Sequence, residues 1–197
     1  MNDEISSAAA GAANSRRSQI AQFSGVLALA ISFLALAVGA YQTRLMQEQA
    51  RASVWPYVTI GKNEDNTQGQ ESFTWRADNN GVGPAKIQSV QVFLDGTPYR
   101  NWHELFAKLA PEQEFHGATS SLNGIVLPAS LNRETTIEMV KPNTPERAKV
   151  FQQAQERIRI EVCYCSVYDE CWIAHSLKTT SETVARCDTG GKLQFEQ

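Results

Sequence analysis

The chain has 197 residues, four cysteines and a formal net charge of −3 at pH 7. Its basic residues are scattered along the sequence, so nothing indicates a nucleic-acid-binding surface or a patch for anionic lipids. The sequence contains no phosphate-binding loop, dinucleotide-binding fingerprint or nucleophile-elbow motif. We therefore expect no cofactor and no catalytic site.

The N-terminal part of the chain is organised around one apolar segment. Residues 1–19 are rich in Ala, Ser and Asn, which predicts a disordered cytoplasmic tail. Residues 20–41 contain no charged side chain, and as a transmembrane helix they would be about 33 Å long, close to the thickness of a hydrocarbon core. Residues 42–53 contain strong helix formers, so we expect a helical stalk that ends before Pro56.

Two features indicate which way the apolar helix crosses the membrane. Arg16 and Arg17 precede it closely, and the positive-inside tendency then places the N-terminus in the cytoplasm. All four cysteines follow it, which suits an oxidising compartment. We expect a single-pass protein of the cytoplasmic (inner) membrane, with its C-terminal domain in the periplasm or extracytoplasmic space. Cleavage after Ala40 is the alternative, although the apolar run is longer than that of a typical signal peptide.

Small residues recur every three or four positions along the apolar helix. Such a stripe lets transmembrane helices approach closely, which predicts a homo-oligomer or a partner packed on this face. The segment is also rich in Ala, Gly and Ser throughout, so composition alone is the competing explanation. The stripe consists of Ala21, Gly25, Ala28, Ser32, Ala35 and Gly39.

Residues 54–197 are expected to form one domain in which apolar residues alternate with polar ones. This period of two is typical of half-buried strands. Its phase slips between Ile87 and Val90, which indicates a bulge. Asp95-Gly96 supplies a hairpin-type turn. The pattern predicts strands near residues 57–60, 73–77, 85–94, 124–127, 135–139, 158–164 and 171–177.

Two short helices interrupt the strand pattern. Asn101, followed three residues later by Glu104, has the spacing of a helix cap, and Thr144 precedes Pro145 at the first helical position. Six or seven strands with two helical insertions predict a mainly β fold, an antiparallel β-sandwich behind the transmembrane helix and its stalk.

The turn at residues 80–85, Asn-Gly-Val-Gly-Pro-Ala, precedes a strand that ends in Leu94-Asp95-Gly96. This arrangement resembles the extracellular immunoglobulin-like modules of bacterial adhesins, and also single-pass bacterial envelope proteins of unassigned function. The resemblance implies an immunoglobulin-like sandwich, without the cysteine and tryptophan pattern of antibody domains. It implies no activity.

The cysteines lie close together near the C-terminus of the chain. Cys163 and Cys165 fall on one face of a predicted strand, where a bond between them would be strained. Cys165 and Cys171 can be opposed in a hairpin, and Cys187 can then reach Cys163. We therefore expect the disulfides Cys165–Cys171 and Cys163–Cys187.

A thiol-redox or metal site built from these four cysteines is the functional alternative. Cys163 and Cys165, together with Cys171 and His175, offer ligands for a soft metal, but the paired Cys-x-x-Cys spacing of zinc sites is absent. His116, near Glu112 and Glu114, is expected to be part of a solvated loop.

The leading hypothesis from sequence is a non-enzymatic, membrane-anchored module that acts through contacts with another envelope protein. The absence of a catalytic constellation and the predicted architecture favour it. The alternatives are the thiol or metal protein described above and an envelope ligand sensor. A short N-terminal tail leaves little room for the output domain that a sensor needs.

Overall fold

The computed structural model describes residues 2–129, 136–188, 190 and 193–196, with side chains from Ser24 onward. The chain divides into two units, Met1–Ala50 and Arg51–Gln197. Each unit is considered by itself.

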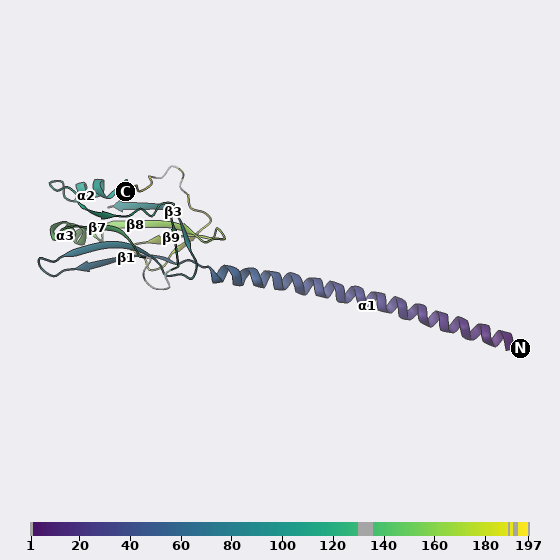
Figure 1. Ribbon diagram of the computed structural model, residues 1–197. Helices are drawn as coiled ribbons and strands as arrows, with labels where there is room; N and C mark the ends of the chain where they lie inside the picture. The colour runs from purple at the N-terminus through teal and green to yellow at the C-terminus, as the bar shows by residue number, and fades with distance from the viewer. Residues whose placement is uncertain (1, 130–135, 189, 191–192, 197) are drawn as a thin grey trace. The chain divides into compact units, whose positions relative to one another are not determined.

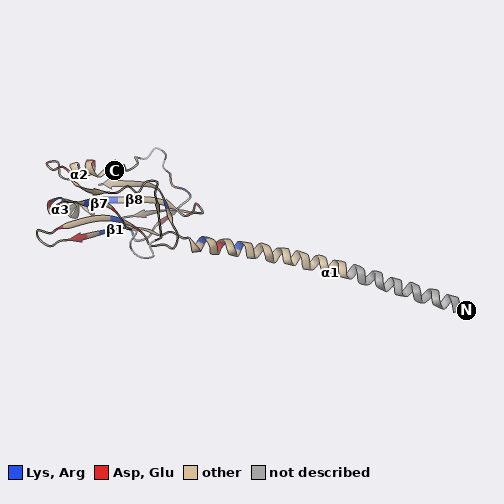
Figure 2. Cartoon of the chain, in the orientation of Figure 1, with Lys and Arg blue, Asp and Glu red and all other residues tan. Residues whose placement is uncertain are grey.

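The first unit is almost entirely the helix α1 (Asn2–Ser53). Its stretch Ser24–Ser53 is long and apolar enough to cross a membrane or to act as a signal anchor, with a mean hydropathy of 2.0 over its most apolar window. The large apolar side chains of this stretch face solvent all round, Phe33 for example being 72% exposed. The charged residues of this stretch all lie toward its C-terminal end, where blue and red appear in Figure 2. They are Arg44, Glu48 and Arg51. A helix that is apolar on all sides is typical of a membrane span.

The N-terminal tail and the stalk are both part of α1. The expectation of a disordered tail at residues 1–19 differs from the structure, in which the helix begins at Asn2. The physical reason is that this stretch is rich in Ala and free of Pro, so the helix extends backwards from the apolar segment without a new nucleation step. The expected stalk over residues 42–53 agrees with the end of α1 at Ser53.

The second unit contains two antiparallel sheets (Figure 1). One sheet has the strand order β1-β2-β7-β5, formed by β1 (Val58–Asp65), β2 (Ser72–Asn79), β7 (Ile137–Pro142) and β5 (Gly117–Thr119). The other has the order β10-β9-β8-β3-β4, formed by β10 (Glu182–Val184), β9 (Cys171–His175), β8 (Ile158–Cys165), β3 (Ala85–Leu94) and β4 (Thr97–Tyr99); β6 (Val126–Leu127) also pairs with β3.

Apolar side chains that alternate with polar ones along the strands form the interior of the second unit. In β8 the residues Ile158, Ile160, Val162 and Tyr164 are all buried, as the period of two predicts. The expected slip in β3 is present as a register shift between Ile87 and Ser89, where β3 pairs with β8. One hydrophobic core therefore receives side chains from both sheets.

Both predicted helices are present, with their predicted caps. At α2 (Trp102–Leu109), the Asn101 side chain accepts a hydrogen bond from the Glu104 backbone N–H at 2.8 Å. At α3 (Pro145–Ala154), Thr144 caps the first turn in the same way. Phe151 of α3 lies between Phe73 of β2 and Phe106 of α2, with ring centroids 5.8 and 5.6 Å away. The helices thus close the core.

The linker after α1 is fitted closely to the turn between β2 and β3. The Trp55 carbonyl accepts hydrogen bonds from the backbone N–H groups of Val82 and Gly83, at 2.9 and 3.2 Å. A Cβ atom at Gly83 would lie 1.9 Å from the Val54 carbonyl oxygen, so glycine is required for this approach. Residues 54 and 55 of the linker are therefore packed into the second unit.

The fold is mostly β, with antiparallel sheets and one apolar N-terminal helix, as expected. The described residues contain ten strands instead of six or seven, because β4, β5 and β10 have only three residues each and were not predicted. Thr135, in one predicted strand, lies outside the described residues.

Candidate functional site

The cysteines of β8 and β9 form a compact sulfur cluster. Cys165 lies opposite Cys171 in the register of the β8–β9 hairpin, and their sulfurs are 2.08 Å apart. Cys163 is paired with Cys187, with an S–S distance of 2.10 Å. This is the pairing that the sequence favours, and it suits an oxidising compartment.

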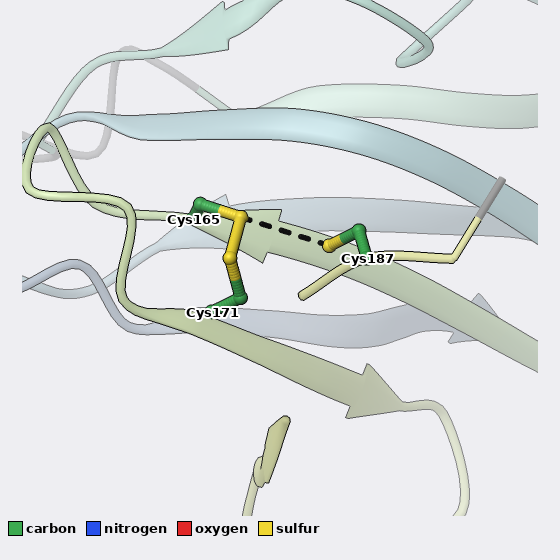
Figure 3. Close-up of side chains that lie close together, drawn as sticks. All are labelled: Cys165, Cys171 and Cys187. Atoms are coloured by element: carbon green, nitrogen blue, oxygen red, sulfur yellow. Dashed lines mark hydrogen bonds between the residues drawn. A yellow bond between two sulfur atoms is a disulfide. The ribbon is translucent and has the colours of Figure 1, made fainter. Parts of the chain in front are cut away.

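The two disulfides are in contact with each other. The Cys165 and Cys187 sulfurs are 3.7 Å apart, and Figure 3 shows Cys187 approaching the Cys165–Cys171 bond. Three of the four sulfurs in the cluster, those of Cys165, Cys171 and Cys187, all lie within 4.8 Å of one another. In the oxidised state this cluster has no thiolate to offer a metal; after reduction the same sulfurs are close enough to share one.

A groove runs along the free edge of β1. Its walls come from β1, from the end of α3 and from the turn between β9 and β10, and its volume is about 600 Å³. It is lined by Thr59, Ile60, Gly61, Lys62, Trp75, Gln155, Glu156, Ser176, Leu177, Lys178 and Thr179. The Tyr57 hydroxyl donates a hydrogen bond to the carbonyl of Thr179, one of these lining residues, at 2.7 Å, which ties the β9–β10 turn to the residue before β1.

The groove combines polar and apolar chemistry. The Lys62 ammonium contacts Gln155 and lies 3.3 Å from a Glu156 carboxylate oxygen. Trp75 lines the groove, and its buried indole N–H has no hydrogen-bond partner among the described residues. In the part of the chain that the structure describes, β1 pairs with β2 and with no other strand, so its second edge can accept a further strand.

The backbone of β1 presents donors and acceptors to this groove. Tyr57 accepts a hydrogen bond from the Asn80 backbone N–H at 2.8 Å, which fixes the alternation of the hairpin. Alternate residues, Ile60, Lys62 and Glu64, consequently turn their backbone N–H and C=O groups away from β2. Among the described residues no second strand pairs with these groups, so this edge of β1 can accept one beside the groove.

The other residues singled out from the sequence, His116 and the small-residue stripe, do not form a site in the part of the chain that the structure describes. His116 is 3.6 Å from Glu114, but both side chains are largely exposed, as expected for a solvated loop. The stripe residues from Gly25 to Gly39 lie on α1, where nothing is within 4 Å of a Cβ built at either glycine. The side chain of Ala21 lies outside the described residues.

The sequence indicated the cysteine cluster but not the groove. Lys62 follows Val58 and Ile60 at spacing two, which places it on the inner face of β1, and that is the only signal for its position. Residues 176–179 lie next to β1 because of how the two sheets pack, and no local sequence pattern encodes that packing. Comparisons with protein-family models, curated proteins and solved structures find no match to this chain.

Proposed function

We propose that this chain is a single-pass anchored binding module of the cell envelope. Its N-terminus lies in the cytoplasm, and its immunoglobulin-like β-sandwich lies in the periplasm or extracytoplasmic space, where it binds another envelope protein without catalysis. The apolar helix α1 and the disulfides support this location.

The open edge of β1 beside the groove is the observation that supports binding. An extended segment of the partner adds to β1 as a further strand, with its backbone bonded to Ile60, Lys62 and Glu64. The groove, about 600 Å³, gives room for alternate side chains of that segment. The rim carries Lys62 and Lys178, which are paired with Glu156 and Glu182, so the groove favours neither sign of charge in the partner segment.

The test is photo-crosslinking in intact membranes from a reactive residue placed at Lys62. The matched control is the same residue at Lys141 on β7, whose side chain is 51% exposed. We expect a protein adduct at Lys62 and none at Lys141. Lys62→Pro, which removes a backbone donor from the open edge, should abolish a partner's binding, whereas Lys62→Gln should weaken it only a few-fold. Equal adducts at both positions would contradict the proposal.

Thiol–disulfide exchange is the second candidate function, and the contact between Cys165 and Cys187 favours it. An external thiolate attacks the Cys171 sulfur, forms a mixed disulfide there and releases Cys165 as a thiolate. Cys165 then attacks Cys187, forms the bond Cys165–Cys187 and releases Cys163 as a thiolate. Peptide mapping of Cys171→Ser tests this step: a Cys165–Cys187 bond with a free Cys163 supports exchange, and an intact Cys163–Cys187 bond opposes it.

A further inference from the structure

Exposed apolar side chains gather at one end of the C-terminal unit. They come from four separate segments: the linker after α1, the β2–β3 turn, the strand β6 and the β8–β9 turn. Each is between 47% and 61% exposed. The residues are Trp55, Val82, Val126, Val167 and Tyr168, and together they are named the apolar end.

Strand pairing places these segments side by side. Lys86, at the start of β3, lies opposite both Val126 of β6 and Cys165, the last residue of β8. The turn that contains Val167 and Tyr168 therefore lies next to the start of β3. The turn that contains Val82 leads directly into β3, and its backbone is hydrogen-bonded to Trp55.

The charges described at this end are paired with one another. The Lys86 ammonium lies 2.5 Å from an Asp169 carboxylate oxygen, and the Arg51 guanidinium lies 3.4 Å from Glu170. Two cations and two anions leave no net charge around the apolar side chains. Such a surface has no electrostatic preference for an anionic partner, and its valines with one Trp and one Tyr have the composition of a membrane-interface contact.

The chain itself brings this end to a bilayer. Trp55 follows α1 directly, and the stalk of residues 42–53 is a helix about 18 Å long. The headgroup layer adds about 5–7 Å beyond the hydrocarbon core. An upright stalk would hold Trp55 about 11–13 Å beyond this layer, so docking requires the stalk to tilt toward the bilayer. The short tether keeps the apolar end near the membrane that holds α1.

We propose that the apolar end docks on the phospholipid surface of the membrane in which α1 is anchored. Trp55 and Tyr168 lie at the level of the headgroups, and the three valines contact the outermost acyl carbons. Zwitterionic lipid is sufficient, because the charges of this end are paired. The proposal rests on membrane anchoring by α1 and is independent of partner binding at β1.

The experiment uses the full chain in vesicles of pure phosphatidylcholine. A photo-reactive residue is placed at Val82 or at Val167, and the matched control is the same residue at Leu177. Leu177 is 50% exposed in the β9–β10 turn and is not one of the five residues of the apolar end. We expect several-fold more lipid adduct from Val82 and Val167 than from Leu177. Equal yields from the three positions, or no lipid adduct, would overturn the proposal.

A second measurement needs no reactive residue. Brominated phosphatidylcholine should quench the fluorescence of Trp55, whereas Trp75 and Trp102 are buried in the core and Trp172 is partly buried on β9. The quenchable fraction should therefore fall clearly in Trp55→Phe, and Trp172→Phe is the control that measures the share of Trp172. Protein adducts in place of lipid adducts at Val82 in intact cells would assign this end to a partner protein and refute the lipid contact. Neither result bears on the crosslinking experiment at Lys62, which tests partner binding at β1.

Discussion

Asn79 illustrates how a single buried side chain fixes the start of the C-terminal unit. Its Oδ1 accepts hydrogen bonds from the backbone N–H groups of Tyr57 and Gly81, both at 3.1 Å. Its Nδ2 donates to the carbonyl oxygens of Gly83 and Leu127, at 2.8 and 3.1 Å. Because both polar atoms of Asn79 are satisfied, its complete burial is tolerated, and it links the linker, the β2–β3 turn and β6.

The two disulfides should differ in their effect on stability. The Cys163–Cys187 bond spans 24 positions and the Cys165–Cys171 bond spans 6, so the first removes more entropy from the unfolded chain. The chain-entropy model gives about 3–4 kcal/mol for the longer loop and about 2 kcal/mol for the shorter one. Cys187→Ser should therefore lower the Tm more than Cys171→Ser, by differential scanning calorimetry. Four free thiols in the wild-type protein would contradict the premise.

Glu71 should make stability depend on pH in the acid range. The hydrogen bond from the Lys149 ammonium, at 2.8 Å, is the main cause that holds the pKa of Glu71 below its ordinary value of 4.5. Because the folded pKa is lowered, this stabilisation is present above about pH 4.5 and is lost as the pH falls through the folded pKa. The Tm difference between wild type and Glu71→Gln should shrink from pH 7 to pH 3. A constant difference would contradict this.

Among the structural elements, those with strong local signals were predictable from sequence. The alternation of β8, the caps at Asn101 and Thr144 and the bulge in β3 each depend on neighbouring residues alone. Three-residue strands such as β5 have no periodicity to detect, because they form only where a longer partner offers a free edge. The groove beside β1 depends on sheet order, which arises from long-range packing.

The linker after α1 should be sensitive to a single methyl group. In Gly83→Ala the new Cβ meets the Val54 backbone, which must shift. We expect a loss of stability of about 1–3 kcal/mol, typical of overpacking. In the control Gly61→Ala the nearest atom is on the flexible Arg76 side chain, at 3.2 Å, and the loss should be small. Chemical denaturation measures both, and equal losses would argue against a close fit.

The stripe on α1 leads to a prediction about association within the membrane. If these small residues pack against a second helix, Gly25→Leu or Gly39→Leu should weaken association, since a bulky side chain separates the helices. Leu29→Ala should matter less. A membrane two-hybrid assay compares the three variants. Equal effects of the three substitutions would indicate that the stripe reflects the composition of the helix alone.

At the scale of the whole molecule, topology is the property on which the proposals depend. A reporter that is active only outside the cytoplasm, fused after Gln197, should be active if α1 crosses the membrane once in the proposed orientation, a location that the disulfides fit. A reporter that requires the cytoplasm should be inactive at the same position. The opposite pattern would contradict both the orientation and the location of the disulfides.

Phe195 has a consequence for the order of events during biosynthesis. Its ring is buried against Trp102 at 5.0 Å between centroids, and its backbone N–H donates to Val90, so the segment lies beside α2 (Figure 1). Phe195 follows every strand of the core in the chain, and it still completes that core. The second unit therefore acquires its native core only after residue 195 has emerged from the ribosome, and the strands made before it remain without this ring until then.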